Sequence, residues 1–320
     1  MKIRRQYIFA LWIFLLVIGA ILFFWTFRSV PFDEIVEVLS SLHLWEIIAL
    51  LAFNVVILLM APLRWWLVLK AQGYQVPYLA LSRYRLEGSG VSYFSPGQHF
   101  GGEPLQVIAL RKHHKVPGSA ALASVTLDRA IEIFGNFAVL VLGITFVFST
   151  GLFSGFELQN ALLVALLVLV LPIAYLTSLW IGLRPISRIL KRFQGSLLDG
   201  VKDAEGKLSD LIHKKPSLFI EGLGCSALVW AALFFEFWLA LFFLGLSLEL
   251  SQLILVVTAG RIALLAPTPG ALGALEASQM LAVQALGFDP AYGLSLGLLI
   301  RVRDVLFAVI GLLLGGLTLR

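Results

Sequence analysis

Two short stretches of this 320-residue chain share residue types that suit the binding of an anion. SPGQHFGGE covers residues 95–103 and PTPGALGALE covers residues 267–276, and the offset along the chain between the two copies is the same for their shared Pro and for their Glu. A hydroxyl residue followed by Pro suits a helix start, whose free N–H groups attract negative charge. Glycine allows a ligand to approach closely, although small residues also serve helix packing. The candidate residues of this kind are Ser95, Gly97, Gly101, Gly102, Thr268, Gly270 and Gly273.

Each stretch ends in a glutamate and is followed by an arginine at nearly the same distance along the chain. Arg129 follows Glu103 in the first copy, and Arg301 follows Glu276 in the second. A guanidinium group binds phosphate through two parallel hydrogen bonds, which the lysine ammonium group does less well. We therefore expect these four residues to face one central cavity, where two cationic elements hold an anionic group such as a phosphate.

Further charged and polar residues occur in the apolar sequence around these stretches. A lone Arg or Asp at the centre of a membrane helix costs roughly 2.5–3.5 kcal/mol on insertion scales, so such groups must be paired or hydrated. They form either a polar lining or ion pairs that lock helices together. Arg64 also suits an interfacial anchor, and His99 a packed histidine. We assign Arg303 to the binding site, and Arg64, Tyr93, His99, Asp128, Glu132 and Asp304 as possible members of it.

Several other chemistries are not indicated. The chain has a single cysteine, Cys225, no HExxH or GxSxG motif and no cluster of metal ligands. The string GVKDAEGKL at 200–208 has five residues between its glycines and a Leu after its Lys, so it fails as a phosphate-binding P-loop. We expect no metal, no cofactor and no enzymatic activity.

The composition is that of a membrane protein. Hydrophobic residues make up 59% and charged residues 13% of the chain, against about 25% charged in soluble domains. Residues 7–27 form an uncharged apolar run that is long enough to span a bilayer, and we interpret it as an uncleaved anchor. The net charge of +5 then indicates loops that face anionic lipid rather than nucleic acid.

The two motif stretches divide the chain into related halves. We predict an all-α polytopic protein with an anchor and external loop at 1–43, a first repeat at 44–149 and a second repeat at 217–320. Each repeat consists of one crossing, one re-entrant hairpin (78–110 or 251–287) and another crossing. The linking segment, 150–216, adds one crossing and a basic loop. Six crossings and two hairpins result, and the second repeat is inverted relative to the first, which is typical of alternating-access transporters.

The distribution of cations predicts the orientation. Of the 24 Lys and Arg residues, 18 fall in loops and ends assigned to the cytoplasm, and one, Arg28, falls in an external loop. By the positive-inside rule both termini are cytoplasmic and residue 288 is external. The basic segment 184–215 is expected to contact anionic lipids as an amphipathic surface helix.

The motifs together resemble a known family, the lysylphosphatidylglycerol synthase transmembrane region, also called flippase-like or UPF0104 integral membrane proteins. The resemblance depends on RWWLVLKAQG (64–73), SPGQHFGGEPLQV (95–107), LDRAIE (127–132), APTPGALGALE (266–276) and LLIRVRD (298–304). Ala271 replaces the second glycine of the usual PGG. The resemblance implies a multi-pass protein of the cytoplasmic (inner) membrane that moves lipids or lipid-linked head groups, rather than one that aminoacylates lipids.

Three functions remain open at this point. The first is a flippase-like transporter that moves a phospholipid or a polyprenyl-linked head group by alternating access. The second is a membrane-embedded transferase that modifies lipids, and the third is a carrier of small solutes or ions. The sequence contains no nucleotide-binding motif, so any energy source would be a gradient or consumption of the moved lipid.

Overall fold

The structure is a computed structural model that describes residues 2–95, 101–149, 156–189 and 196–319. Every regular element in these ranges is a helix, and none of the described residues forms a strand, which confirms the all-α class. The elements are α1 (Lys2–Arg28), α2 (Phe32–Ser40), α3 (Leu44–Met60), α4 (Leu63–Ala71), α5 (Tyr78–Tyr93), α6 (Glu103–His114), α7 (Gly118–Ser149), α8 (Phe156–Trp180), α9 (Pro185–Ile189), α10 (Ser196–Lys214), α11 (Ser217–Phe243), α12 (Leu250–Ala263), the 3₁₀ turn η2 (Pro269–Ala271), α13 (Ala274–Ala285) and α14 (Pro290–Leu319).

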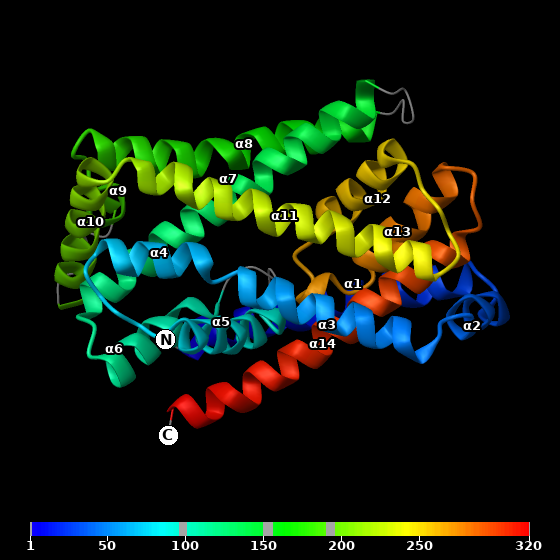
Figure 1. The fold of residues 1–320 in the computed structure, drawn as a ribbon, viewed down its shortest axis with the longest axis horizontal. Helices are drawn as coiled ribbons and strands as arrows, with labels where there is room; N and C mark the ends of the chain where they lie inside the picture. The colour runs from blue at the N-terminus through cyan, green and yellow to red at the C-terminus, as the bar shows by residue number, and fades with distance from the viewer. Residues whose placement is uncertain (1, 96–100, 150–155, 190–195, 320) are drawn as a thin grey trace.

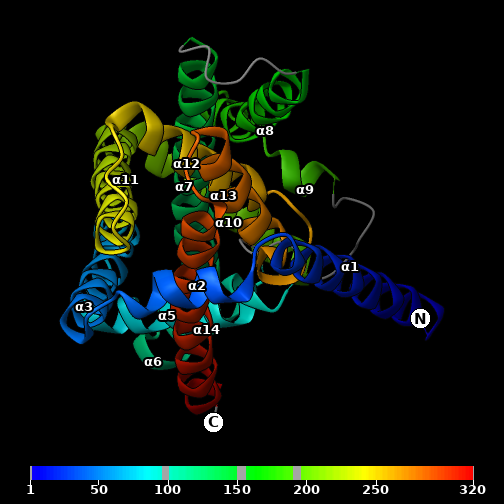
Figure 2. The same cartoon turned by 90° about the vertical axis from the view of Figure 1, so that its right-hand side faces the viewer.

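Most of the long helices follow the long axis of the molecule (Figure 1). Helices α7, α8, α11 and α14 run along it, as do α3 and α4 in succession. The α5–α6 pair lies toward the left end of that view and the α12–α13 pair toward the right, while α10 crosses the left end. Seen end-on, the N-terminal part of α1 diverges from the other helices (Figure 2).

Three of the described helical stretches are long and apolar enough to cross a membrane: Leu44–Ala71, Gly118–Ser149 and Ser217–Phe243. The pair Trp12–Arg28 and Phe32–Ser40, bent by 83°, would be a fourth if it forms one span. These apolar helices make the chain an integral membrane protein with several spans. The count of six crossings stays a prediction.

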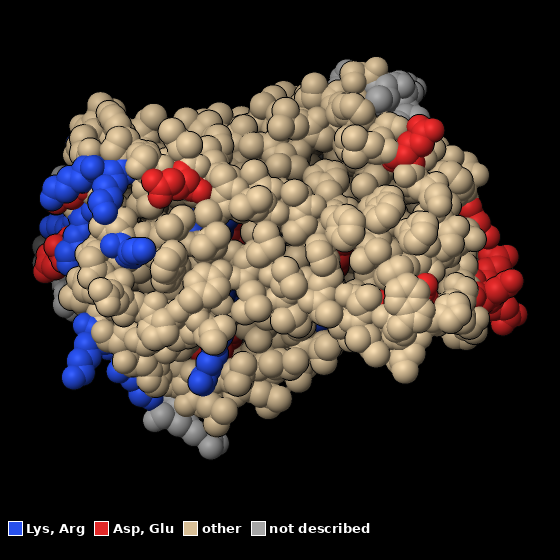
Figure 3. All heavy atoms as spheres, in the orientation of Figure 1, with Lys and Arg blue, Asp and Glu red and all other residues tan. Residues whose placement is uncertain are grey.

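The charged surface residues separate toward the two ends of the long axis (Figure 3). Lys and Arg side chains gather at the left end, where α6 ends in Arg111 and Lys112, with some acidic side chains among them, while only acidic side chains gather at the right end near α2. The surface between them is almost free of charge in this view. A broad uncharged belt between two polar ends matches the profile of a bilayer.

The segment expected to be an external loop, residues 28–44, instead contains helix α2. Pro31 precedes the helix and cannot continue α1, while Asp33 and Glu34 lie in the first turn, where the helix dipole favours negative charge. Ile35 is buried and Phe32 is exposed, so α2 is amphipathic. The prediction failed because the three acids, Asp33, Glu34 and Glu37, were taken as the mark of a loop, and the amphipathic pattern of this helix extends over only nine residues.

Two helix crossings bring the halves of the chain together. Helix α5 packs along α14, and α12 packs along α7. At the first crossing, a Cβ on Gly90 would lie 2.7 Å from the Ala308 carbonyl oxygen and 2.9 Å from the Leu312 nitrogen. Only glycine allows backbones to approach this closely. Because the two helix breaks follow α5 and α12, these crossings hold one break beside α14 and the other beside α7.

Candidate functional site

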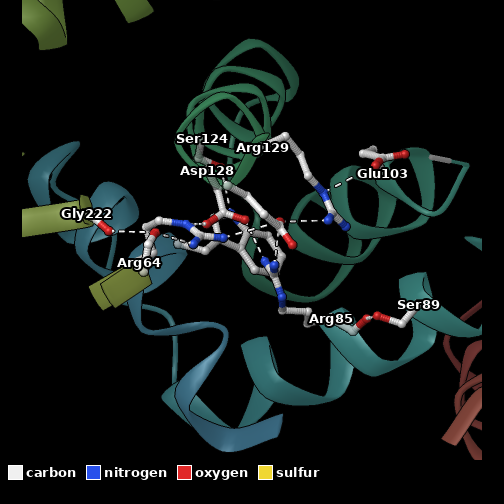
Figure 4. A network of polar contacts seen from close by, with 11 residues as sticks. Arg64, Arg85, Ser89, Glu103, Ser124, Asp128, Arg129 and Gly222 are labelled. Carbon is white, nitrogen blue, oxygen red and sulfur yellow. Dashed lines mark hydrogen bonds and ion pairs between the residues drawn. The ribbon is translucent and has the colours of Figure 1, made fainter. Parts of the chain in front are cut away.

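A cluster of charged side chains is built around one face of α7 (Figure 4). Asp128 is almost fully buried, and its carboxylate accepts hydrogen bonds from Arg64 (2.7 Å) and Arg85 (2.6 Å). Glu132, one turn further along α7, accepts from Arg85 (2.6 Å) and Arg129 (2.9 Å). Spacing of four residues puts both carboxylates on one helix face.

The interpretation of Arg64 as an interfacial anchor is wrong. Its side chain is buried between α4, α7 and α11, where it also donates to the Ser226 hydroxyl at 2.8 Å. Removing a guanidinium group from water in this way requires full pairing, which Asp128 supplies. For Arg64 and Asp128, the structure therefore shows ion pairs that join helices.

Glu103 and Arg129 form the first of the two predicted Glu–Arg pairs. The Arg129 Nε lies 3.2 Å from the Glu103 Oε1, and neither atom has a hydrogen-bond partner among the described residues. The other carboxylate oxygen of Glu103 accepts from the Gly101 N–H at 2.8 Å. The pair is half-open, since 23% of the Glu103 side chain is exposed. It is held by charge alone rather than by aligned hydrogen bonds.

Glu276 and Arg301 form the second pair, and its geometry is tighter. Arg301 donates to both carboxylate oxygens of Glu276, at 2.8 and 3.0 Å, and Glu276 is fully buried. Arg301 also donates to the Tyr93 hydroxyl at 3.0 Å and to the backbone carbonyls of Gly270 and Ala271. The bidentate arrangement is the strong form of an arginine–carboxylate contact.

The predicted capping role of Thr268 is not found, and the helix start at Pro96 that Ser95 was predicted to cap lies outside the described residues. The Ser95 hydroxyl donates to the Val91 carbonyl, and the Thr268 hydroxyl donates to that of Leu272. Helix α13 begins after Gly273, whose N–H donates to Glu276 at 3.0 Å. Each return helix therefore has its own glutamate in its first turn, which supplies the negative charge that the helix end attracts.

The candidate glycines divide into packing and site positions. A Cβ on Gly102 would collide with the Gly88 backbone, and one on Gly273 would collide with the Gly19 backbone of α1. These two positions serve helix packing. Gly270 (φ +58°) abuts Tyr93 and Arg301, and Gly101 (φ +126°) abuts Ser95. The remaining two candidates in the first break, Gly97 and His99, lie outside the described residues.

A third cluster joins α14 to α11 and α3. Arg303 contacts the Asp304 carboxylate at 2.9 Å, donates to Glu236, and donates to the Asn54 side-chain oxygen at 3.0 Å. Two carboxylates here face one guanidinium group. Asn54 and Glu236 were missed as site residues because each is a single polar residue in a long apolar run.

Two cavities adjoin these clusters. The larger, of about 560 Å³, is lined by Glu103, Arg129 and Glu132 together with apolar residues, mainly of α7 and α8; we call it cavity 1. The smaller, of about 310 Å³, is lined by residues of α3, α5, α12 and α14 including Arg303 and Asp304; we call it cavity 2.

Glu276 and Arg301 line neither cavity, so the two pairs do not face one common cavity as predicted. Tyr93 and the Gly270 carbonyl cover Arg301, and α1 covers the break beside Gly273. The chain forms one open pair and one enclosed pair.

Two arginines of the site were missed. Arg85 was counted with the cytoplasmic flank of the first hairpin, although it is buried against α7. Arg261 lines both cavities and was overlooked inside the apolar segment 251–266, where it is the only charged residue. A lone cation in an apolar segment was the signal that could have revealed it. Among the described residues, no group of three or more His, Cys, Asp or Glu side chains could hold a metal ion.

Comparison with known proteins shows similarity along almost the whole chain. A family model described as the lysylphosphatidylglycerol synthase TM region matches residues 12–311. A UPF0104 membrane protein of Methanothermobacter thermautotrophicus is 23% identical over 299 residues, which cover 87% of this chain and 86% of the relative. A UPF0104 membrane protein of Methanocaldococcus jannaschii is 23% identical over 131 residues, covering 40% of this chain and 39% of the relative.

Proposed function

Because the chain belongs to the lysylphosphatidylglycerol synthase transmembrane family, we propose that it moves a lipid with an anionic head group across the cytoplasmic membrane. One observation carries this proposal: cavity 1 is lined both by the partly exposed Glu103–Arg129 pair and by many apolar side chains. A lipid has the same two parts, a charged head and apolar chains. A membrane-embedded transferase and a solute carrier are the alternatives that the experiment below must separate.

The contacts of the two helix breaks support an inverted repeat. Three residues after each glutamate lies a glutamine, Gln106 or Gln279. The amide group of Gln106 lies against Gly88 of α5, and that of Gln279 lies against Gly260 of α12. Equivalent contacts in two segments that share the offset of the two motif stretches are what a repeated unit produces.

The helix crossings follow the same symmetry. The first arm of each pair packs on the last long helix of the other half, α5 on α14 and α12 on α7. Gly143 of α7 faces Thr258 of α12, and Gly315 of α14 faces Leu105 of α6 and Glu87 of α5. We infer six crossings and two hairpins that enter from opposite sides. The cationic left end in Figure 3 then faces the cytoplasm, together with both termini.

The difference between the two pairs suggests how transport would proceed. In cavity 1 the Arg129–Glu103 contact lacks hydrogen-bond geometry, so a head-group phosphate can replace Glu103 as the partner of Arg129. Arg301 keeps both of its bonds to Glu276 behind Tyr93. Alternating access would exchange these roles, opening one pair while the other closes. Neither arginine is left uncompensated at any stage, which avoids the roughly 3–5 kcal/mol cost of an unpaired buried charge.

Transport of a fluorescent phosphatidylglycerol in proteoliposomes tests this function, with a membrane-impermeant quencher reporting the lipid that changes leaflet. We expect Arg129→Lys to lower the rate about tenfold per folded protein, because lysine cannot reproduce the bidentate contact. Arg111→Lys, an exposed position at the end of α6, is the matched control and should transport normally. Protein-dependent changes in lipid mass would instead indicate a transferase. Solute uptake without lipid movement would indicate a carrier.

A further inference from the structure

Arg261 differs from the other arginines of the membrane interior. Arg64, Arg85, Arg129, Arg301 and Arg303 each contact at least one carboxylate within 3.2 Å. Within the part of the chain that the structure describes, Arg261 has no salt bridge and no side-chain hydrogen bond. Its guanidinium carbon lies 4.4 Å from the centroid of the Trp230 ring on α11. Among the described residues, this cation therefore has an aromatic contact but no carboxylate within salt-bridge distance.

Stacking on Trp230 leaves the hydrogen-bonding capacity of Arg261 unused. A guanidinium group contacts an aromatic ring through its face, while its five N–H donors point outward in its plane. In a low-dielectric interior such donors need acceptors, and a bidentate oxyanion matches their geometry. The arrangement is that of a pre-positioned anion ligand rather than a completed structural contact.

The position of Arg261 connects the two cavities. Arg261 and Leu264, both at the C-terminal end of α12 or just beyond it, line cavity 1 and cavity 2. On the side of cavity 1 its neighbours in the lining include Arg129, and on the side of cavity 2 they include Arg303 and Asp304. Arg261 and Leu264 are the residues that the linings of the two cavities share.

The charges on the two sides make a bound anion exchangeable. Around α7, three arginines face the three carboxylates of Glu103, Asp128 and Glu132, so that cluster is neutral. Around Arg303, the carboxylates of Glu236 and Asp304 exceed the cations by one. An anion on Arg261 therefore meets no net charge on the α7 side and a net negative charge on the Arg303 side, which favours release over permanent retention.

We propose that Arg261 binds the phosphate of a phospholipid at the junction of the two cavities, with the acyl chains along the apolar wall of cavity 1. This rests on the proposed function and specifies its substrate class, an anionic phospholipid. The apolar wall suits the chains because Leu122, Phe137 and Leu171 line the same cavity. It also distinguishes a lipid phosphate from free phosphate, which has no use for that wall.

Ligand-induced thermal stabilisation of the purified full chain in detergent tests the assignment without requiring transport. We expect phosphatidylglycerol to raise the melting temperature of the wild type. Phosphatidylcholine should raise it less, because the positive charge of its choline compensates its phosphate. Arg261→Gln should weaken phosphatidylglycerol binding about tenfold, since it removes a charge-assisted bidentate contact. The matched control is Arg83→Gln, since Arg83 pairs with Glu87 on α5 and lines neither cavity.

The outcomes separate this assignment from the proposed function. An unchanged lipid-induced shift in Arg261→Gln would overturn the role of Arg261, and transport dependent on Arg129 would still stand. Equal shifts with inorganic phosphate and phosphatidylglycerol would overturn the lipid assignment. If Arg261→Gln does not fold, Arg261→Lys is measured instead: loss of selectivity for phosphatidylglycerol over phosphatidylcholine supports the proposal, and retained selectivity with retained affinity refutes it. A lipid-induced rise in melting temperature that depends on Arg261, without any lipid transport, would refute the proposed function but not the role of Arg261.

Discussion

At the scale of single residues, the two glutamates occupy the positions where the sequence predicted a bound anion. Glu103 and Glu276 each accept a backbone N–H at the start of a return helix and each neutralise an arginine. A helix end with its own carboxylate is an anion site that is already filled. An anionic ligand that binds there must compete with the resident glutamate. The strength of each Glu–Arg pair therefore decides which arginine is available to a ligand.

The first prediction compares the two glutamates by the same substitution. Glu276→Gln leaves Arg301 buried without a counter-charge, since Glu276 is fully buried and the Arg301 side chain is 11% exposed. We expect the free energy of unfolding to fall by about 3 kcal/mol or more. Glu103→Gln should cost less, because Arg129 keeps its contact with Glu132 and the site is open to cavity 1.

Chemical or thermal unfolding in detergent, followed by intrinsic fluorescence, measures both variants. The expected order is wild type, then Glu103→Gln, then Glu276→Gln as the least stable. Equal losses in the two variants would contradict the distinction between an open and an enclosed pair.

At the scale of elements, the positions of the two Glu–Arg pairs depend on how closely the helices cross. Helix α5 carries Arg85 and Tyr93, which reach the clusters on α7 and at η2, and α5 is held in place by its crossing with α14. The crossing in turn depends on small residues that bring two backbones into contact. A change of one methyl group at this crossing should therefore disturb both clusters.

Gly90→Ala is the test of this crossing. The new Cβ would lie 2.7 Å from the Ala308 carbonyl oxygen, and backbone atoms cannot move aside as a side-chain end can. We expect a loss of about 1–3 kcal/mol in the free energy of unfolding. Gly224→Ala is the control: it lies in helix α11 with no atom within 4 Å of its Cβ, so it should be neutral or stabilising by up to about 1 kcal/mol. Similar losses of stability in both variants would show that close backbone contact at the α5–α14 crossing is not what makes Gly90 necessary.

The sequence predicted these elements unevenly, for physical reasons. The long apolar runs were found because their signal extends over many residues, as at α1 and α11. The starts of the return helices were placed at Pro96 and Pro269, although α6 begins at Glu103 and α13 at Ala274. Pro suits a first helical position, but at Pro269 it starts only a 3₁₀ turn, because Gly270 has a positive φ that ends the helical path.

Pairing between distant residues was predictable only where it was repeated. The common offset between the two halves singled out Glu103 with Arg129 and Glu276 with Arg301, and the structure brings each pair into contact. Arg85 and Arg261 have no arginine at the corresponding position of the other half, so the offset gave no sign of them. That the two pairs lie in separate surroundings depends on tertiary packing, which the repeat itself does not encode.

At the scale of the whole molecule, the charges at the two ends and the apolar belt between them determine how the protein lies in a membrane. Helix α10 lies across the left end in Figure 1, and the turn between α13 and α14 lies at the right end. If the left end is cytoplasmic, residues of α10 are reachable only from inside and residues near 288 only from outside. This is the arrangement in which the two hairpins enter from opposite leaflets.

Labelling of single cysteines in intact cells decides this orientation. In a Cys225→Ala background, Asp289→Cys and Lys202→Cys place one thiol at each end, and both native residues are exposed or partly exposed at the surface. A membrane-impermeant maleimide should label position 289 at once and position 202 only after permeabilisation. The physical reason is that the 18 cations of the assigned cytoplasmic segments resist translocation. Labelling of both positions from the same side would contradict the inverted repeat, because α11, the one full crossing predicted between them, would then fail to cross. Reversed labelling would be consistent with the inverted repeat but would place the open Glu103–Arg129 pair on the external side. Lipid would then enter from the external leaflet instead of the cytoplasmic one.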